Sequence, residues 1–167
     1  MPGDQVMSRA RKIVLVGPTR AGKSTLIRAL EGQSGPARKT QAISYTRIAT
    51  DTPGEYLENP MYYRVLLPSA AEARWVLLIQ DATSPRNHYP PNFARAFPGK
   101  SVGIITKSDH PKADVERSRK FLEKLALTGP ILTVSAYTGE GLAELRALLG
   151  LAELPEPPEP AAEGQPQ

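Results

Sequence analysis

The sequence predicts a single α/β domain, in which a mostly parallel, doubly wound sheet carries helices on both faces. Two observations lead to this fold class. Strand-like and helix-like segments alternate along the chain, as they do when helices connect parallel strands. The strongest strand-like segments, at 13–16 and 75–80, are continuous apolar runs, which is typical of strands covered on both sides. A chain of 167 residues can bury one such core without covalent cross-links.

The first part of the chain supplies a strand, a helix and a loop in that order. Residues 12–16 are predicted as the first strand, and residues 22–30 as the first helix, which Gly32 ends. Residues 33–44 are polar and punctuated by glycine and proline, which indicates a loop. A short, weak strand is expected at 45–50.

The middle of the chain is predicted to contain a helix, two strands and a proline-rich loop. Residues 61–73 have helical spacing and lack glycine, and 75–80 is a strong buried strand. Four prolines make residues 83–98 a loop, with one helical turn at 92–97. Another strand is expected at 101–106.

The last third adds one amphipathic helix, one strand and one further helix. Residues 114–127 are predicted as a helix because Val115, Leu122 and Leu125 fall on one stripe together with Ala126. The last strand is expected at 130–134 and the last helix at 141–149.

Composition sets the domain boundaries and excludes several classes of protein. We expect a flexible N-terminus at 1–10, one domain at 11–152, and a disordered tail rich in proline and glutamate at 153–167. The chain has no cysteine, so we expect no disulfide and no thiolate metal site. No apolar run is long enough for a transmembrane helix, and the first ten residues lack the apolar core of a signal peptide. The expected location is the cytoplasm.

The net charge of +4 does not by itself indicate a nucleic-acid partner. Lysine and arginine total 21 against 17 acidic residues, and the basic side chains are scattered along the chain. No basic run is interleaved with aromatic residues, as nucleic-acid binding would favour. A phosphate site and a well-solvated surface explain the excess, so no nucleic acid is expected as a partner.

The most specific motif lies between the first strand and the first helix. Residues 17–24, Gly-Pro-Thr-Arg-Ala-Gly-Lys-Ser, match the phosphate-loop pattern G-x-x-x-x-G-K-[ST]. The glycines allow backbone angles that turn N–H groups inward, and the following helix adds the positive end of its dipole. Lys23 is expected to reach the β- and γ-phosphates, and the Ser24 hydroxyl to bind Mg²⁺. The predicted phosphate-binding residues are Gly17, Pro18, Thr19, Arg20, Ala21, Gly22, Lys23, Ser24 and Thr25.

A second motif, Asp51-Thr52-Pro53-Gly54, follows the weak strand about thirty residues later. In small GTPase-like proteins an Asp-x-x-Gly at this place holds Mg²⁺ through water, and the glycine N–H meets the γ-phosphate. The sequence therefore predicts Asp51 as a metal residue and Gly54 as a phosphate contact.

The loop at 33–44 supplies the last expected metal ligand. Thr40 is the best-placed second hydroxyl for Mg²⁺, ahead of Thr46 and Thr50, which fall in or near the strand. Arg38 or Lys39 can neutralise charge at the γ-phosphate, and a solvated basic loop explains these two residues equally well. The predicted metal set is Ser24, Thr40 and Asp51.

The residues that follow the last two strands predict recognition of guanine. Thr106-Lys107-Ser108-Asp109 resembles the [NT]-K-x-D element, in which a carboxylate accepts two hydrogen bonds from guanine N1–H and the exocyclic amine. Adenine offers no such pair of donors, so a site built this way discriminates strongly. The Lys107 stem can cover the base while its ammonium reaches back toward the phosphate loop. Ser135-Ala136 resembles the element whose backbone N–H meets guanine O6. The predicted base contacts are Thr106, Lys107, Asp109, Ser135 and Ala136.

Taken together, these segments resemble the EutP/PduV family of small P-loop proteins. The strings Lys-Thr-Gln-Ala at 39–42 and Asp-Thr-Pro-Gly-Glu-Tyr at 51–56 carry the resemblance most specifically, and it covers roughly residues 11–150. The resemblance implies a Ras-like P-loop NTPase fold and a role in bacterial ethanolamine or propanediol utilisation. It also implies microcompartment association, with shell proteins or pathway enzymes as candidate partners.

Two positions depart from the usual pattern of signalling GTPases. Glu55 stands where many have a glutamine that orients water, and its carboxylate repels a nearby γ-phosphate. Thr106 stands where asparagine is commoner, which we expect to weaken a tie between loops. The predicted catalytic residues are Lys23, Thr40 and Glu55.

Three functions are compatible with these residues. The first is a Mg²⁺-dependent hydrolase of GTP, with ATP as the other candidate nucleotide. The second is a kinase that moves the γ-phosphate to a small carboxylate such as acetate. The third is an adaptor without enzymatic activity, whose nucleotide sets its docking on a microcompartment shell.

Overall fold

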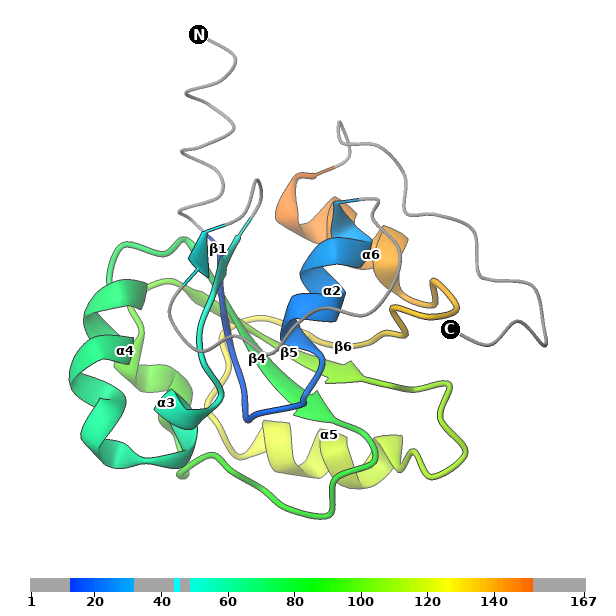
Figure 1. The fold of residues 1–167 in the computed structure, drawn as a ribbon, viewed down its shortest axis with the longest axis horizontal. Coiled ribbons are helices and arrows are strands. Elements are labelled where there is room, and N and C mark those ends of the chain that lie inside the picture. Colours follow the sequence, from blue (N-terminus) through cyan, green and yellow to red (C-terminus); the bar gives the residue numbers. More distant parts are fainter. Residues whose placement is uncertain (1–12, 32–43, 46–48, 152–167) are drawn as a thin grey trace, which may run out of the picture.

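A computed structural model of the protein describes residues 13–31, 44–45 and 49–151. Within these residues, one sheet of six strands runs in the order β2-β3-β1-β4-β5-β6 (Figure 1). The strands are β1 Ile13–Val16, β2 Ser44–Tyr45, β3 Thr50–Asp51, β4 Trp75–Asp81, β5 Lys100–Thr106 and β6 Ile131–Thr133. All neighbouring pairs are parallel except β2 with β3. The predicted fold class, a doubly wound and mostly parallel sheet, is confirmed.

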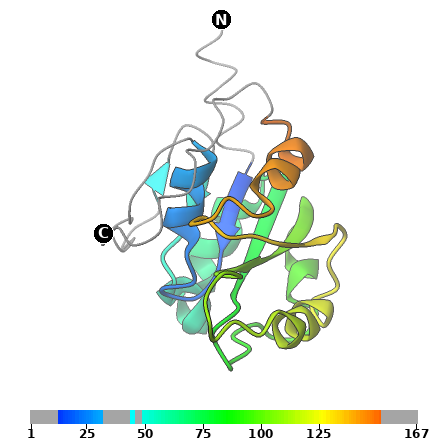
Figure 2. The same ribbon diagram turned by 90° about the vertical axis from the view of Figure 1, so that its right-hand side faces the viewer.

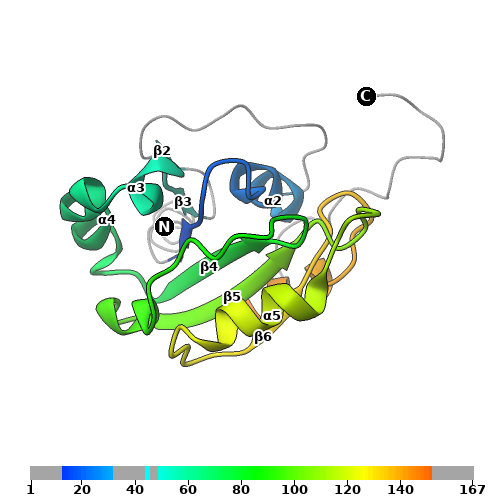
Figure 3. The ribbon, with the colours of Figure 1, turned by 90° about the horizontal axis from the view of Figure 1, so that it is seen from below.

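Helices cover both faces of the sheet, as the continuous apolar strands require. The α-helices are α2 Lys23–Leu30, α3 Glu55–Glu58, α4 Tyr63–Ala70, α5 Val115–Glu123 and α6 Leu142–Leu149, and the short 3-10 helices are η1 Pro60–Tyr62 and η2 Phe93–Ala96. One buried cluster packs α2 and α6 on the sheet, and a second packs α4 and α5 on it. Figure 3 shows α2 and α5 on opposite sides of β4 and β5, and Figure 2 shows α6 above and α5 below.

The strand register brings the carboxyl ends of four parallel strands to one edge of the sheet. Strand β1 pairs in parallel with β3 on one side and with β4 on the other, and Leu15 lies opposite both Asp51 and Leu77. Strand β4 runs beside β5 as far as the pair Asp81 and Thr106. Because the strand order reverses around β1, the loops at this edge diverge, and open α/β sheets bind ligands at such a place.

Several predicted boundaries change in the structure. The single strand expected at 45–50 is wrong: β2 and β3 are two short antiparallel strands, and 46–48 lie outside the described residues. The helix expected at 61–73 is divided into η1 and α4, and the short helix α3 precedes it. The helix expected at 114–127 is shorter, because Asp114 caps it by accepting the Arg117 N–H and Ala126 has a φ of 60°. The helical turn expected at 92–97 is confirmed by η2.

Other expectations fall outside what the structure describes. The N-terminus at 1–10, the tail at 153–167 and nearly all of the loop at 33–44 are not among the described residues. None of the described helices has the length and apolar character that a membrane crossing demands.

Candidate nucleotide site

The phosphate loop is a tight turn between β1 and α2. Arg20 and Gly22 both adopt left-handed backbone angles, with φ of 66° and 95°. Lys23 is buried, with 6% of the residue exposed, and its ammonium donates to the carbonyls of Gly17 at 2.8 Å and Pro18 at 3.0 Å. Two carbonyls of the loop therefore hold the ammonium of the lysine that the motif assigns to a polyphosphate.

Gly17, the first residue of this loop, lies against β4 with no room for a side chain. A Cβ at Gly17 would lie 2.9 Å from the Ile79 Cβ, so glycine is required there. Tyr89 joins β1 and β4 beside Gly17, since its hydroxyl shares its proton between the Ile79 carbonyl at 2.6 Å and the Val16 carbonyl at 3.0 Å. Burial raises the pKa of Tyr89 well above its ordinary value, which keeps the hydroxyl a donor. Tyr89 was not predicted from the sequence, because a loop containing four prolines shows no periodic pattern that would mark a buried side chain.

The Asp51–Gly54 segment is held beside the phosphate loop by two contacts. The Thr52 hydroxyl donates to the Leu15 carbonyl at 2.7 Å in the interior. A Cβ at Gly54 would lie 2.0 Å from the Thr19 nitrogen, so the two backbones touch and only glycine fits. The predicted phosphate contacts of the two motifs therefore meet at Thr19.

A carboxylate that the sequence analysis did not select also reaches this point. Glu58, the last residue of α3, accepts the Thr19 N–H through its Oε1 at 2.8 Å. Figure 1 shows α3 beside the blue loop that joins β1 to α2. The four-residue helix is too short to be found from periodicity, so nothing in the sequence placed Glu58 at the loop.

Thr106 ties the phosphate loop to the end of β5. Its hydroxyl donates to the Ala21 carbonyl at 2.6 Å, and the side chain is buried at 4% exposure. The hydroxyl of threonine at this register therefore spans the gap between strand and loop, and the expectation that threonine makes a weaker tie than asparagine stays a prediction.

Lys107 adds a second tie from the same strand end. Its backbone is left-handed, with a φ of 61°, and its ammonium reaches both the Arg20 carbonyl and the Asp81 Oδ2 at 2.7 Å. Asp81 ends β4 and is held in turn by the backbone N–H and hydroxyl of Thr83, at 2.8 and 2.6 Å. Asp81 was not predicted as a site residue, although its place at the carboxyl end of a buried strand is a signal for one.

The last two predicted base-binding loops are joined by one short hydrogen bond. The Ser135 hydroxyl donates to the Asp109 Oδ1 at 2.7 Å, and Ser135 is fully buried. The same hydroxyl oxygen accepts the N–H groups of Tyr137 at 3.2 Å and Thr138 at 3.0 Å. Ala136 lies inside this turn. The carboxylate that would read a base is thus oriented by a buried group, while Asp109 itself is exposed.

The predicted metal residues are only partly placed. Ser24 lies in the first turn of α2, and the backbone of Asp51 lies in β3 beside β1. Thr40 lies outside the described residues, as do the side chains of Asp51 and Glu55. No cluster of three or more His, Cys, Asp or Glu side chains occurs in the described part of the chain. Two hydroxyls and one carboxylate are hard oxygen donors, and such donors fit Mg²⁺ when phosphate and water complete its shell.

Comparison with known proteins agrees with this fold. Bacterial selenocysteine-specific elongation factor EF-Sec has a similar structure, with a TM-score of 0.57 and 21% sequence identity over 84% of this chain and 28% of that one. The fold and the phosphate loop define a P-loop NTPase of the Ras-like fold. The family described as "PduV-EutP: Ethanolamine utilisation - propanediol utilisation" matches residues 10–150, and the chain belongs to this family.

Two relatives illustrate the membership. The propanediol utilization protein PduV of Citrobacter freundii is 38% identical over 59% of this chain, and the match spans 66% of PduV, just under two thirds of its length. A protein of Escherichia coli strain K12 named "Probable acetate kinase EutP" is 31% identical over 81% of this chain and 86% of its own length.

Proposed function

We propose that this protein binds and hydrolyses GTP with Mg²⁺, as an accessory protein of bacterial ethanolamine or propanediol utilisation. One observation carries the proposal: Ser135 orients the Asp109 carboxylate at 2.7 Å, while Thr106 and Lys107, at the end of β5 just before Asp109, hold the phosphate loop. The residues that would read the base are therefore coupled to those that would hold the phosphates.

Guanine is favoured over adenine by the chemistry of the Asp109 carboxylate. An oriented carboxylate accepts the N1–H and the exocyclic amine of guanine, whereas adenine presents an unprotonated ring nitrogen at the same position. A mismatched base would leave the carboxylate unpaired, which is a strong penalty in a site of this kind. The Lys107 ammonium is held by the Arg20 carbonyl and the Asp81 carboxylate, and its aliphatic stem would cover one face of the base.

Hydrolysis would depend on positioning and electrostatics. Water would attack the γ-phosphorus in line, the bond to the β-γ bridging oxygen would break, and the proton would leave to solvent. Lys23 would stabilise charge on the phosphoryl oxygens, with Ser24, Thr40 and Asp51 holding Mg²⁺, which supplies further charge stabilisation when bound. Glu55, directly after Gly54, would orient the water, and its negative charge favours slow turnover.

Transfer to acetate is the second candidate, and a relative's name favours it. The EutP relative named "Probable acetate kinase EutP" matches most of this chain. In this alternative the acetate oxygen replaces water as the attacking group, and acetyl phosphate and the nucleoside diphosphate are the products. The family also supports a cytoplasmic location, with microcompartment shell proteins or pathway enzymes as partners.

Product analysis separates the two reactions. We expect purified protein with Mg²⁺·GTP to release inorganic phosphate at a rate independent of acetate, and Lys23→Ala to abolish the release. The same assays with Mg²⁺·ATP provide the comparison. If nucleoside diphosphate forms only when acetate is present, and acetyl phosphate is trapped as the hydroxamate, the reaction is transfer to acetate and not hydrolysis. Unchanged turnover in Lys23→Ala would exclude this site for either reaction.

A further inference from the structure

The contact between Glu58 and the phosphate loop has a consequence for which nucleotide state the site favours. Glu58 Oε1 accepts the Thr19 N–H at 2.8 Å. This bond joins α3 to a loop 39 residues earlier in the chain, and Thr19 is one of the predicted phosphate-binding residues. A carboxylate oxygen on this amide makes the same kind of charge-assisted hydrogen bond that a phosphate oxygen would make.

The position of Thr19 identifies which phosphate meets this carboxylate. The Thr19 nitrogen lies against Gly54, where an added Cβ would come within 2.0 Å of it. In P-loop NTPases of this fold, the segment that contains this glycine is the one ordered by the γ-phosphate and released when that phosphate is lost. The Thr19 N–H therefore lies where the two motifs meet around the terminal phosphate, and the β-phosphate is served by the rest of the loop.

We infer that Glu58 competes with the γ-phosphate for the Thr19 N–H, so that this residue sets the balance between nucleoside triphosphate and diphosphate. One N–H group forms one strong hydrogen bond, and two anions at this point also repel each other. A triphosphate would have to displace the Glu58 carboxylate, whereas a diphosphate would leave it in place. The inference rests on the proposed nucleotide binding and adds the residue that discriminates its two states.

Displacing Glu58 would also move the exposed apolar surface that follows it in the chain. Glu58 ends α3, and the next residue, Asn59, caps η1 by accepting the Met61 N–H at 3.0 Å. Met61 is 74% exposed and Val65, in α4, is 44% exposed. The segment tied to the phosphate loop through Glu58 thus carries apolar side chains in contact with solvent, and the γ-phosphate would change its position.

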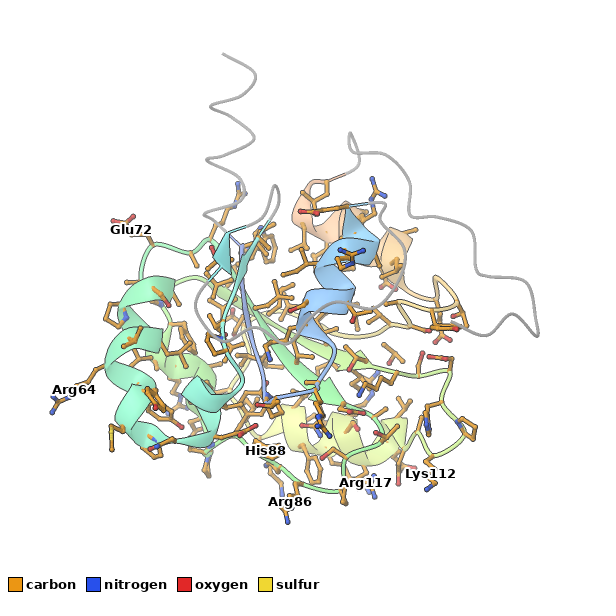
Figure 4. The ribbon with its side chains drawn as sticks, viewed as in Figure 1. Arg64, Glu72, Arg86, His88, Lys112 and Arg117 are labelled. Carbon is orange, nitrogen blue, oxygen red and sulfur yellow. The ribbon has the colours of Figure 1, made fainter. Side chains whose placement is uncertain are left out.

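The test compares the affinity ratio of two nucleotides in three proteins. Wild type, Glu58→Gln and Glu72→Gln are titrated calorimetrically with Mg²⁺·GDP and Mg²⁺·GTPγS, and in parallel with Mg²⁺·ADP and Mg²⁺·ATPγS. Glutamine keeps the size of the side chain and removes its charge. Glu72 is the matched control, because it is exposed and points away from the molecule (Figure 4). In Glu58→Gln we expect the triphosphate analogue to gain about tenfold relative to the diphosphate, the equivalent of about 1.4 kcal/mol. Glu72→Gln should keep the wild-type ratio.

The possible results separate this inference from the function on which it rests. Nucleotide binding by wild type with a ratio unchanged within twofold in Glu58→Gln overturns the role of Glu58 and leaves the proposed function intact. Equal gains for diphosphate and triphosphate overturn it as well, because the carboxylate would then repel both. Failure of wild type to bind either pair at millimolar concentration overturns the nucleotide function itself.

Discussion

The Lys107 ammonium lies 2.7 Å from the Asp81 carboxylate and joins the ends of β4 and β5 to the phosphate loop. Asp81 is 12% exposed at its side chain and Lys107 is 38% exposed, so solvent screens the pair only in part. Asp81 thus orients the lysine whose stem would cover the base.

Asp81→Asn should weaken nucleotide binding by releasing this lysine. Loss of the charged partner costs about 1 kcal/mol after allowance for solvent, which corresponds to about a fivefold higher Kd for Mg²⁺·GDP. Calorimetric titration measures this change. Glu123→Gln, at the exposed end of α5, is the control and should bind as wild type does. Equal affinity in Asp81→Asn and wild type would show that the Asp81 contact does not orient Lys107 for binding.

Asp109→Asn should change which base is bound. The variant replaces an acceptor with an amide donor, so GDP affinity should fall by about 100-fold or more. Xanthosine diphosphate, which carries a carbonyl where guanine has its amine, should gain affinity. Competition titrations of GDP against xanthosine diphosphate measure the exchange. Asp114→Asn is the matched control, because asparagine caps a helix as well as aspartate does. Retention of the wild-type preference would remove Asp109 from base recognition.

Thr106→Val should loosen the phosphate loop and destabilise the fold. Valine has the shape of threonine but cannot donate to the Ala21 carbonyl, so a buried acceptor is left without its partner. The free energy of unfolding should fall by about 1–3 kcal/mol, measured by denaturant titration. Thr106→Ser retains the hydroxyl and should recover most of the loss. A serine variant as unstable as the valine variant would show that packing, rather than the hydrogen bond, dominates at this position.

Tyr89→Phe should destabilise the protein below pH 10 and alter its pH dependence above it. The variant leaves the carbonyls of Val16 and Ile79 without this donor, a loss of about 1–3 kcal/mol. Burial raises the pKa of Tyr89 in the folded protein. Above about pH 10 the unfolded chain releases this proton and the folded chain keeps it, so the advantage of wild type falls by about 1.4 kcal/mol per pH unit. Chemical denaturation of both proteins from pH 8 to pH 11 measures the difference, and a constant gap would contradict the buried, protonated hydroxyl.

The sequence predicted what depends on local pattern. The phosphate loop was recognisable because its glycines, lysine and serine occupy fixed positions after a buried strand, and the left-handed Gly22 follows from that turn. The parallel sheet followed from continuous apolar strands such as β4. These features need no knowledge of distant contacts.

The parts that were missed depend on contacts between distant segments. Glu58 meets Thr19 across 39 residues, and Tyr89 meets Val16 across 73, so neither contact has a local signature. The expected strand at 45–50 was wrong because strands of two residues, such as β2 and β3, are too short to show alternation. The hydrogen bond from Thr106 to the Ala21 carbonyl spans 85 residues and likewise has no local signature.

Titration of wild-type protein with GDP and ADP in the presence of Mg²⁺ tests the central claim most directly. The account predicts that GDP binds at least about 100-fold more tightly than ADP, because Asp109, held by Ser135, accepts two hydrogen bonds that adenine cannot donate. Equal affinity for the two nucleotides, or no binding of either at millimolar concentration, would contradict it.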